Sequence, residues 1–351
     1  MRLKKTFYSN GKLLLTGEYA VLDGALSLAV PTRYGQSLSV KSAETSQLIW
    51  KSLDENGQIW FETVFDLKSF SVAVGFNDVE RNAENEATET TLLALLRGAQ
   101  KLNPAFLKDA RGYHVETRLT FPRNWGLGSS STLINNIAQW AEIDAYHLLW
   151  NVYSGSGYDI ACAQHDRPIL YRLSENPHRT RQMLHEEPQP GVTQHPEKGN
   201  ANSLRAVRVE EVAFDPPFSD NLHFVHLNKK QDSQEGIATY RKKDGDRRQL
   251  VQKISEITRK TVACKSLTEF EALAVEHETL LSQMLQRPTV GELLFPDFGG
   301  VVKSLGAWGG DFVLATGDAK TPSYFKEKGY PTVVAYSDMV LTAADDIIEK
   351  P

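Results

Sequence analysis

The stretch Pro122–Ser131, PRNWGLGSSS, joins a predicted strand to a predicted helix and decides the fold. Apolar residues alternate through Tyr113–Phe121 before it, as in a strand, and recur at helical spacing through Thr132–Trp150 after it. Glycine lets a backbone approach a ligand closely, and a helix N-terminus attracts anions. The stretch matches neither GxxxxGK[ST] nor GxGxxG. We interpret it as a phosphate-binding turn; a plain glycine turn with a serine N-cap is the alternative.

Strands and helices are expected to mix in both halves of the chain. Paired strands with a turn at Asp23–Gly24 are expected over Lys12–Val30. Further strands are expected at Leu38–Val40, Ile49–Trp50, Trp60–Val64, Leu222–Leu227, Phe312–Ala315 and Val333–Tyr336. Further helices are expected at Glu89–Asn103, Gly236–Tyr240, Asp246–Thr261 and Leu267–Met284.

A polar segment, Ser174–Leu204, interrupts this pattern. It is rich in Pro, Gln, Glu, His, Gly and Asn, and it has too few apolar residues to form structure alone, so we expect a long mobile loop or insertion. A chain of 351 residues suits two packed domains. We therefore expect an N-terminal domain at 1–173, a loop at 174–205 and a C-terminal domain at 206–351.

Composition excludes several classes of protein. The net charge of −5 argues against a nucleic-acid binder or a protein of anionic membranes. The two cysteines, Cys162 and Cys264, lack metal-ligand spacing, so neither a zinc site nor a disulfide framework is expected. The apolar run Leu13–Leu15 is too short for a signal sequence or a membrane span. We expect a cytoplasmic protein.

Four segments in order resemble the motifs of the GHMP kinases, the superfamily of galactokinase, homoserine kinase, mevalonate kinase and phosphomevalonate kinase. They are GKLLLTGEYAVLDG (Gly11–Gly24), GLGSS (Gly126–Ser130), GSGYDIACA (Gly155–Ala163) and KSLGAWGGDFVLA (Lys303–Ala315). Any one alone is weak, but four in this order span nearly the whole chain. The resemblance implies a two-lobed α+β fold, with an N-terminal lobe like domain 2 of ribosomal protein S5 and a ferredoxin-like C-terminal lobe. We expect a monomer or a homodimer.

Three of these segments are more similar to the phosphomevalonate kinase branch, namely GEYAVL at Gly17–Leu22, GSGYD at Gly155–Asp159 and GGD at Gly309–Asp311. The mevalonate kinase branch more often has histidine where Tyr19 stands. The resemblance implies a kinase that transfers the γ-phosphoryl group of ATP to a small acceptor, phosphomevalonate or mevalonate, in the mevalonate pathway of isoprenoid biosynthesis. It also implies Mg²⁺ bridging the β- and γ-phosphates.

Lys12 and Asp159 are the expected catalytic residues. Lys12 would neutralise charge on the transferred group or lower the pKa of the attacking group; the alternative is a solvated lysine at a strand end. Asp159 would deprotonate a substrate hydroxyl, or orient Lys12 and Mg²⁺; the alternative is a turn residue. A phosphate acceptor is already ionised near neutral pH, and Asp159 would then act through its charge.

The resemblance also implies binding residues. The ATP phosphates would contact Gly126, Leu127, Gly128, Ser129, Ser130 and Ser131, and Mg²⁺ would bind Ser129 and Ser130. The acceptor would contact Glu18, Tyr19, Ser156, Gly157, Lys229, Ser233, Gly306, Ala307, Gly309, Gly310 and Asp311. For Lys229 and Ser233, which would hold a carboxylate or phosphate, a capped and solvated helix start is the alternative.

The chain departs from the family in three places. Trp308 stands in GAWGGD where GAGGG is usual, and it would either cover the ligand or block the site. The first motif begins SNGK, without the usual proline. The helix before the catalytic aspartate has His147 and Leu148 where mevalonate kinases have a Mg²⁺-binding glutamate, and Glu142 and Asp144 lie further back. These departures favour the alternative of a degenerate member that binds nucleotide or metabolite, or acts as a scaffold, without efficient turnover.

Overall fold

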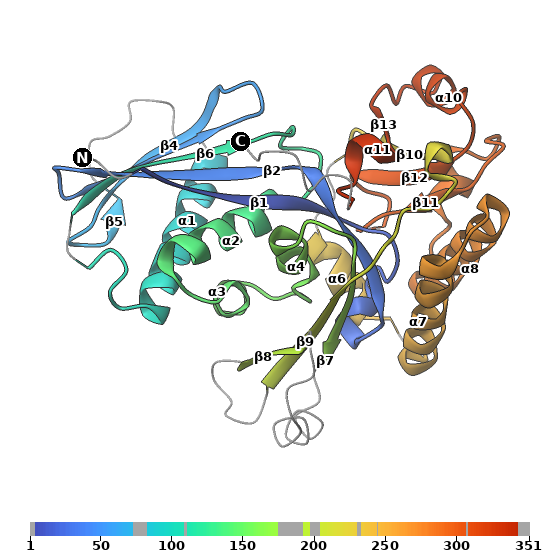
Figure 1. The fold of residues 1–351 in the computed structure, drawn as a ribbon, viewed down its shortest axis with the longest axis horizontal. Coiled ribbons are helices and arrows are strands. Elements are labelled where there is room, and N and C mark those ends of the chain that lie inside the picture. Colours follow the sequence, from blue (N-terminus) through green and yellow to red (C-terminus); the bar gives the residue numbers. More distant parts are fainter. Residues whose placement is uncertain are drawn as a thin grey trace.

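The structure is a computed structural model. It describes residues 4–72, 83–108, 111–174, 192–196, 204–229, 233–243, 245–306 and 308–342. Two sheets organise the described chain, and Figure 1 shows them side by side, each with its own helices.

The first sheet has nine strands within the described residues, in the order β5-β4-β3-β6-β2-β7-β9-β8, with β1 paired to β2. The strands are β1 (Lys4–Leu14), β2 (Ser27–Ala43), β3 (Gln47–Leu53), β4 (Ile59–Asp66), β5 (Ser71–Val72), β6 (Gly112–Leu119), β7 (Ile169–Ser174), β8 (Val192–Pro196) and β9 (Leu204–Glu211). Alternate residues of β3 are buried, and so are those of β6 from Val115 to Leu119, as the sequence alternation over Tyr113–Phe121 predicts for β6. The pair β3–β6 is parallel, and the other pairs are antiparallel.

Four helices lie along one face of this sheet, below it in Figure 1. They are α1 (Ala83–Leu102), α2 (Ser129–Ala141), α3 (Ala145–Val152) and α4 (Tyr158–Gln164). Their apolar stripes, such as Leu92, Leu95 and Leu96 of α1, are buried against the sheet or neighbouring helices. A short 3₁₀ helix, η1 (Ala20–Asp23), precedes β2.

The single helix expected over Thr132–Trp150 is wrong, because the structure has two. Helix α2 ends where Glu142 adopts a left-handed conformation with φ of 54°. The carboxylate of Asp144 then accepts hydrogen bonds from the backbone N–H groups of Tyr146 and His147 and caps α3. The apolar period runs through the break, which is why periodicity alone predicts one helix.

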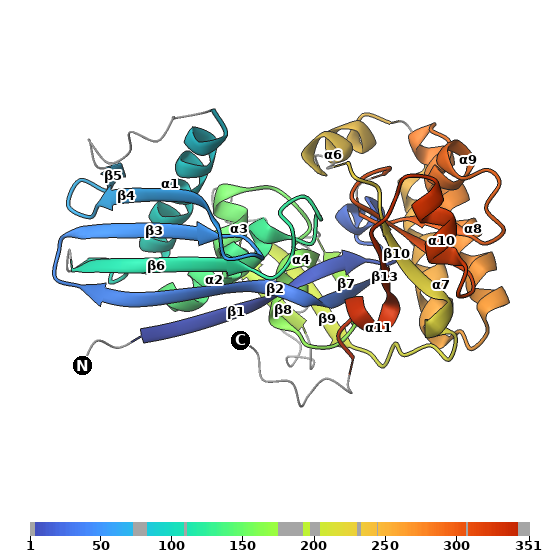
Figure 2. The same ribbon diagram turned by 90° about the horizontal axis from the view of Figure 1, so that it is seen from above.

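The second sheet has the order β11-β12-β10-β13, with every neighbouring pair antiparallel. Its strands are β10 (Leu222–His226), β11 (Val302–Ser304), β12 (Phe312–Thr316) and β13 (Val333–Ala335). The helices of this half are η2 (Ser219–Asn221), α6 (Ser233–Arg241), α7 (Arg247–Ala263), α8 (Leu267–Leu285), α9 (Val290–Leu294), α10 (Thr321–Glu327) and α11 (Tyr336–Met339). Helices separate β10 from β11 and β12 from β13, which gives the β-α-β-β-α-β order of ferredoxin-like folds. Figure 2 shows α6–α10 gathered around this smaller sheet.

The polar segment Ser174–Leu204 contains regular structure where only a loop is expected. Strand β8 lies within it and pairs with β9 in the first sheet. Pairing with a neighbouring strand satisfies backbone groups without apolar side chains, so composition does not reveal β8. The rest of the segment lies outside the described residues. Most of β9 falls in the expected C-terminal domain, 206–351, so the chain crosses to the second sheet after Glu211.

A single buried cluster joins the two halves. It includes Leu28 and Leu38 of β2 together with Ile254 of α7 and Leu281 of α8. A smaller cluster that includes Val225 and Phe325 lies on the second sheet. Among the described residues, no helix is long and apolar enough to cross a membrane.

Candidate active site

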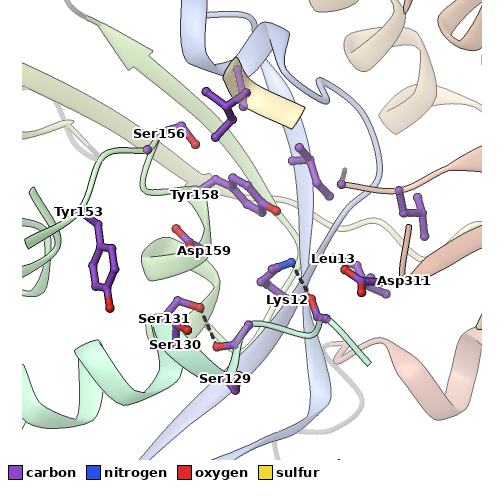
Figure 3. Close-up of a pocket in the computed structure, with 18 of the residues that line it drawn as sticks. Lys12, Leu13, Ser129, Ser130, Ser131, Tyr153, Ser156, Tyr158, Asp159 and Asp311 are labelled. Atoms are coloured by element: carbon purple, nitrogen blue, oxygen red, sulfur yellow. Dashed lines mark hydrogen bonds between the residues drawn. The ribbon is translucent and has the colours of Figure 1, made fainter. Parts of the chain in front are cut away.

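A cavity of about 340 Å³ lies where the two halves meet, and all four sequence motifs contribute to its wall. Figure 3 shows Lys12, the three serines Ser129–Ser131 and Asp159 around one space, with Asp311 on its other side. The motifs are more than 290 residues apart at their extremes, so only the fold brings them together.

The N-terminus of α2 forms one end of the cavity. Gly128 precedes the helix with φ of 91°, a left-handed conformation that disfavours any residue with a side chain. A Cβ on Gly128 would lie 2.7 Å from Oγ of Ser131 and 3.1 Å from Cγ of Lys12. The first amides of a helix have no partner within it, so the wall at Gly128–Ser131 presents donors suited to phosphate oxygens. The expected contact Leu127 is buried behind the wall rather than in it.

Lys12 connects β1 to the turn Gly126–Ser131, which is called the phosphate loop below. Its backbone N–H donates to the carbonyl of Leu127 at 2.9 Å, and its Nζ donates to the carbonyl of Gly126 at 2.8 Å. The ammonium also lies 6.0 Å from the centre of the Tyr158 ring. These contacts hold a positive charge beside the helix N-terminus, where a transferred phosphoryl group would carry negative charge.

Asp159 lies in the first turn of α4 and lines the cavity. Burial raises the pKa of its carboxyl group, and the positive charge of Lys12 partly offsets that rise. One oxygen, Oδ1, accepts a hydrogen bond of 3.1 Å from the N–H of Ile160. A carboxylate with a raised pKa is a stronger base than an exposed one, so the position suits proton abstraction from a hydroxyl group.

Asp311 contacts the phosphate loop from the loop between β11 and β12, which is called the glycine-rich loop below. Its backbone pairs with Leu227 and Lys229, and its carboxylate lies so close to Gly126 that a Cβ there would overlap it. Asp311 itself has φ of 30°, which is rare for a residue with a side chain. A glycine at position 126 is therefore required by this close approach.

The structure separates the expected acceptor residues into two groups. Tyr19, Ser156, Gly306 and Asp311 line the cavity. Glu18, Gly157, Lys229, Gly309 and Gly310 do not. Ala307 and the side chain of Ser233 lie outside the described residues.

Glu18 is fully buried away from the cavity, in a charged cluster with Lys303, His277 and Glu278. Nζ of Lys303 lies 2.6 Å from Oε1 of Glu18, and Nε2 of His277 lies 3.1 Å from Oε2. Burial alone would raise the pKa of Glu18, but the charges and hydrogen bonds of Lys303 and His277 lower it overall. The side chain thus ties the first motif to β11 and α8 instead of facing a ligand.

Trp308 neither covers nor blocks the cavity. The side chain is buried, its indole N–H donates to the carbonyl of Pro288 at 3.1 Å, and it is absent from the cavity wall. The glycine-rich loop turns this large side chain into the protein and presents Gly306 and Asp311 to the cavity.

Oxygen atoms suited to Mg²⁺ line the cavity, although no group of three or more His, Cys, Asp or Glu side chains among the described residues could hold a metal. The hydroxyls of Ser129 and Ser130 and the carboxylate of Asp159 are the hard oxygen ligands that Mg²⁺ prefers, with water and phosphate completing its shell. Glu142 and Asp144 lie off the cavity wall, and Asp144 caps α3. The serines and Asp159 therefore fit a partly hydrated Mg²⁺.

Arg123 and Tyr158 are among the wall residues that sequence reasoning did not include in the site. Arg123 lines the cavity, lies 3.7 Å above the ring of Trp60 and donates to Glu84 at 2.7 Å. Its position next to the phosphate loop in the sequence was the one available signal, and that position fits a solvated loop residue equally well. Tyr158 faces Lys12, and burial raises the pKa of its hydroxyl well above the usual value, so it stays protonated.

No family model and no curated protein sequence matches the chain. Several solved structures do match over nearly their full length. The L. major mevalonate kinase in complex with R-mevalonate has a TM-score of 0.63 at 12% identity and covers 97% of each chain. The Streptococcus pneumoniae phosphomevalonate kinase in complex with phosphomevalonate and AMPPNP has a TM-score of 0.60 at 17% identity, covering 96% of this chain and 98% of that one.

The Lactococcus lactis galactokinase complexed with galactose has a TM-score of 0.60 at 14% identity, covering 97% of this chain and 94% of that one. These three structures are kinases of the superfamily that the sequence motifs resemble. At such low identity the likeness concerns the fold alone. The chain has the two-lobed α+β fold of the GHMP kinases, as expected from its sequence.

Proposed function

We propose that the chain is an ATP-dependent kinase that transfers the γ-phosphoryl group of ATP to a small acceptor. One observation carries the proposal: Lys12, Asp159 and the helix N-terminus at Gly128–Ser131 share one cavity wall. The first supplies a positive charge, the second a base and the third a set of phosphate-binding amides. Phosphoryl transfer requires little beyond this positioning and charge neutralisation.

Different residues of the cavity wall would bind the phosphates, stabilise the transferred group and accept the proton. The amides of the first turn of α2 and the hydroxyls of Ser129 and Ser130 would hold the ATP phosphates and Mg²⁺. Bound Mg²⁺ would neutralise charge on the phosphate oxygens. Lys12, fixed by the Gly126 carbonyl, would stabilise negative charge on the group in transfer. Asp159 would accept the proton of an attacking hydroxyl group.

The proposal extends to the chemical identity of the acceptor. Mevalonate and phosphomevalonate are the first candidates, because the motifs GEYAVL, GSGYD and GGD resemble the phosphomevalonate kinase branch and two of the three similar structures were solved with R-mevalonate and with phosphomevalonate. These acceptors would place the protein in isoprenoid biosynthesis. Tyr19, Ser156 and Tyr158 are residues with hydroxyl groups on the same cavity wall as Asp159, and Val21 and Ile237 supply apolar surface for a carbon chain.

ADP release from Mg·ATP tests this proposal directly. Mevalonate, phosphomevalonate, homoserine and galactose would be offered separately to the purified protein. We expect turnover on one acceptor, reduced by about 10²- to 10⁴-fold in Asp159→Ala and Lys12→Ala. Lys51→Ala, which removes a partly exposed ion pair with Glu62 on the same sheet, is the control and should keep full activity. Equal activity in all variants would contradict the assigned roles.

A nucleotide-binding protein without turnover is the second candidate. Trp308 no longer favours it, because that side chain lies off the cavity wall. His147 and Leu148, which stand where mevalonate kinases have a Mg²⁺-binding glutamate, still favour it. Thermal stabilisation by ATP, with and without Mg²⁺, separates the outcomes: saturating nucleotide at about 100 times Kd should add about 2.7 kcal/mol to the free energy of unfolding. Stabilisation without turnover on any acceptor supports the second candidate; no stabilisation contradicts both.

A further inference from the structure

The glycine-rich loop between β11 and β12 carries one large side chain that does not face the cavity. Trp308 is 7% exposed, and its indole N–H donates to the carbonyl of Pro288, between α8 and α9. Its backbone N–H donates to the hydroxyl of Tyr19 at 2.8 Å. Both hydrogen bonds restrain the loop at Trp308, which is absent from the cavity wall and lies between Gly306 and Asp311, which line it.

Tyr19 is held in a conformation that it would not adopt alone. Its φ of 57° and ψ of −45° lie in a region that residues with side chains rarely occupy, at a cost of about 1–3 kcal/mol. Such a conformation persists only where the surroundings fix it. Tyr19 also lines the cavity, so the strain falls on a residue of the candidate active site.

The surroundings of Tyr19 do fix it. Its ring stacks on Tyr240 of α6, with ring centres 5.5 Å apart and planes 19° apart. The hydroxyl of Tyr240 donates to the carboxylate of Asp23, and the guanidinium of Arg247 lies 5.3 Å from the Tyr240 ring. A Cβ on Gly236 would lie 2.7 Å from the Tyr19 hydroxyl, so α6 leaves no room for movement on that side.

The loop needs such an anchor because of its composition. Gly306 and Gly309 have φ of 67° and 74°, and Asp311 has φ of 30°. Glycines lose more conformational freedom on folding than other residues, so a loop of this kind samples many conformations unless it is tied. Trp308 lies in the middle of the loop, where two hydrogen bonds and a buried ring restrict it most.

We propose that Tyr19 and Trp308 form a latch that positions the glycine-rich loop, with Trp308 as a positioning residue that never touches the ligand. The latch fixes Gly306 and Asp311 at the cavity and keeps Tyr19 as part of the same wall. The proposal rests on the proposed kinase function, since the geometry that it fixes is that of the candidate acceptor site. Passive core packing is the competing explanation, and it predicts only a loss of global stability.

Hydrogen–deuterium exchange tests the latch without needing turnover. Tyr19→Phe keeps the ring and its stacking on Tyr240 but removes the acceptor of the Trp308 N–H. We expect amide exchange in segment 303–312 to become about two- to tenfold faster, with α8 unchanged. Tyr336→Phe is the matched control, because it removes a buried tyrosine hydroxyl that donates to the carbonyl of Phe214, away from the cavity.

The exchange rates of the two variants distinguish a latch from passive packing. Faster exchange confined to 303–312 in Tyr19→Phe, and absent there in Tyr336→Phe, supports a latch. Unchanged exchange in 303–312, or equal acceleration throughout both variants, overturns it. Because this readout is independent of catalysis, a protein without kinase activity would still give a clear answer, and the two failures remain distinguishable.

Kinetics then tests the consequence for an acceptor that is turned over. Trp308→Phe keeps a buried ring but loses the hydrogen bond to Pro288, and Trp308→Gly removes the anchor. We expect kcat/KM for the acceptor to fall in the order wild type, Trp308→Phe, Trp308→Gly, by about two- to tenfold at the first step. Kd for Mg·ATP should change by less than kcat/KM for the acceptor, since the hydrogen bond from Lys12 to Gly126 also holds the phosphate loop. Equal kcat/KM in all three proteins would overturn the latch.

Discussion

At the scale of single residues, burial and neighbouring charges change the pKa of the carboxyl group of Glu278. Glu278 on α8 belongs to the cluster that holds Glu18, and Ser304 donates to its Oε2 at 3.0 Å. Its other oxygen lies 3.8 Å from Nζ of Lys303 and 4.0 Å from Nδ1 of His277. Burial raises the pKa of Glu278 to about 7; Lys303 lowers it and the negative charge of Glu18 raises it further. The cluster therefore changes its charge near neutral pH.

Glu278→Gln should change the pH dependence of stability. The pKa of Glu278 is about 4.5 in an unfolded chain and about 7 in the folded protein, so the wild type loses stability as pH rises between these values. Glutamine cannot ionise, so the variant should gain up to about 3 kcal/mol relative to wild type between pH 4.5 and pH 8. Urea unfolding at several pH values measures this difference.

The control for that experiment is Glu276→Gln, since Glu276 is exposed on the same helix. Glutamine at position 278 can still accept the Ser304 hydrogen bond, which isolates the effect of charge. A stability difference between Glu278→Gln and wild type that is constant from pH 4.5 to pH 8 would refute the assignment.

At the scale of elements, the beginning of α2 sets the site. Gly128 holds a left-handed conformation, Lys12 and Ser131 surround it, and Ser131 Oγ donates to the Gly128 carbonyl at 2.8 Å. The turn thus directs the helix N-terminus into the cavity and fixes the lysine of β1 beside it. A substitution in this turn should weaken nucleotide binding without changing the overall fold.

Gly128→Ala should weaken nucleotide binding. A left-handed conformation costs a residue with a Cβ about 1–2 kcal/mol, and here the Cβ would also press on Lys12 and Ser131. We expect Kd for Mg·ATP to rise about tenfold or more by isothermal titration calorimetry. Gly155→Ala is the matched control, because Gly155 also lines the cavity and nothing lies within 4 Å of a Cβ there. Equal Kd in both variants would argue against the role of the turn.

At the scale of the whole molecule, the two halves are held together by more than the cavity. Oγ1 of Thr258 on α7 lies 2.7 Å from Oγ1 of Thr16 and also donates to the carbonyl of Leu26. The chain returns to the first sheet near its end, where Thr32 of β2 bridges to Val340. The main buried cluster is shared between the halves. Folding of each half therefore depends on the other.

The protein should unfold in one cooperative transition. Because the main core spans both halves, neither half can lose its structure without exposing apolar surface of the other. Differential scanning calorimetry should give a calorimetric enthalpy equal to the van't Hoff enthalpy, and saturating Mg·ATP should raise Tm of that transition. Two resolved transitions, with only one shifted by nucleotide, would contradict this expectation.

The sequence by itself determined the secondary structure around the phosphate loop. The strand, the turn at Gly126–Ser131 and the helix after it follow from alternation, glycine and helical period, which act over neighbouring residues. The four motifs, in the order of the GHMP kinases, predicted the α+β fold. The similarity to solved kinase structures over nearly the whole chain confirms that fold. The resemblance of the motifs, and not a local pattern, made Lys12 and Asp159 candidates, and both line the cavity.

Only the tertiary structure decided which side chains face that cavity. Glu18 is one residue from Tyr19, yet the first is buried against Lys303 and the second lines the wall. Trp308 turns inward because Tyr19 and Pro288 accept its hydrogen bonds. These partners come from distant positions in the chain, and no periodic pattern encodes them. A side chain's direction depends on such long-range contacts, whereas its secondary structure depends mainly on its neighbours.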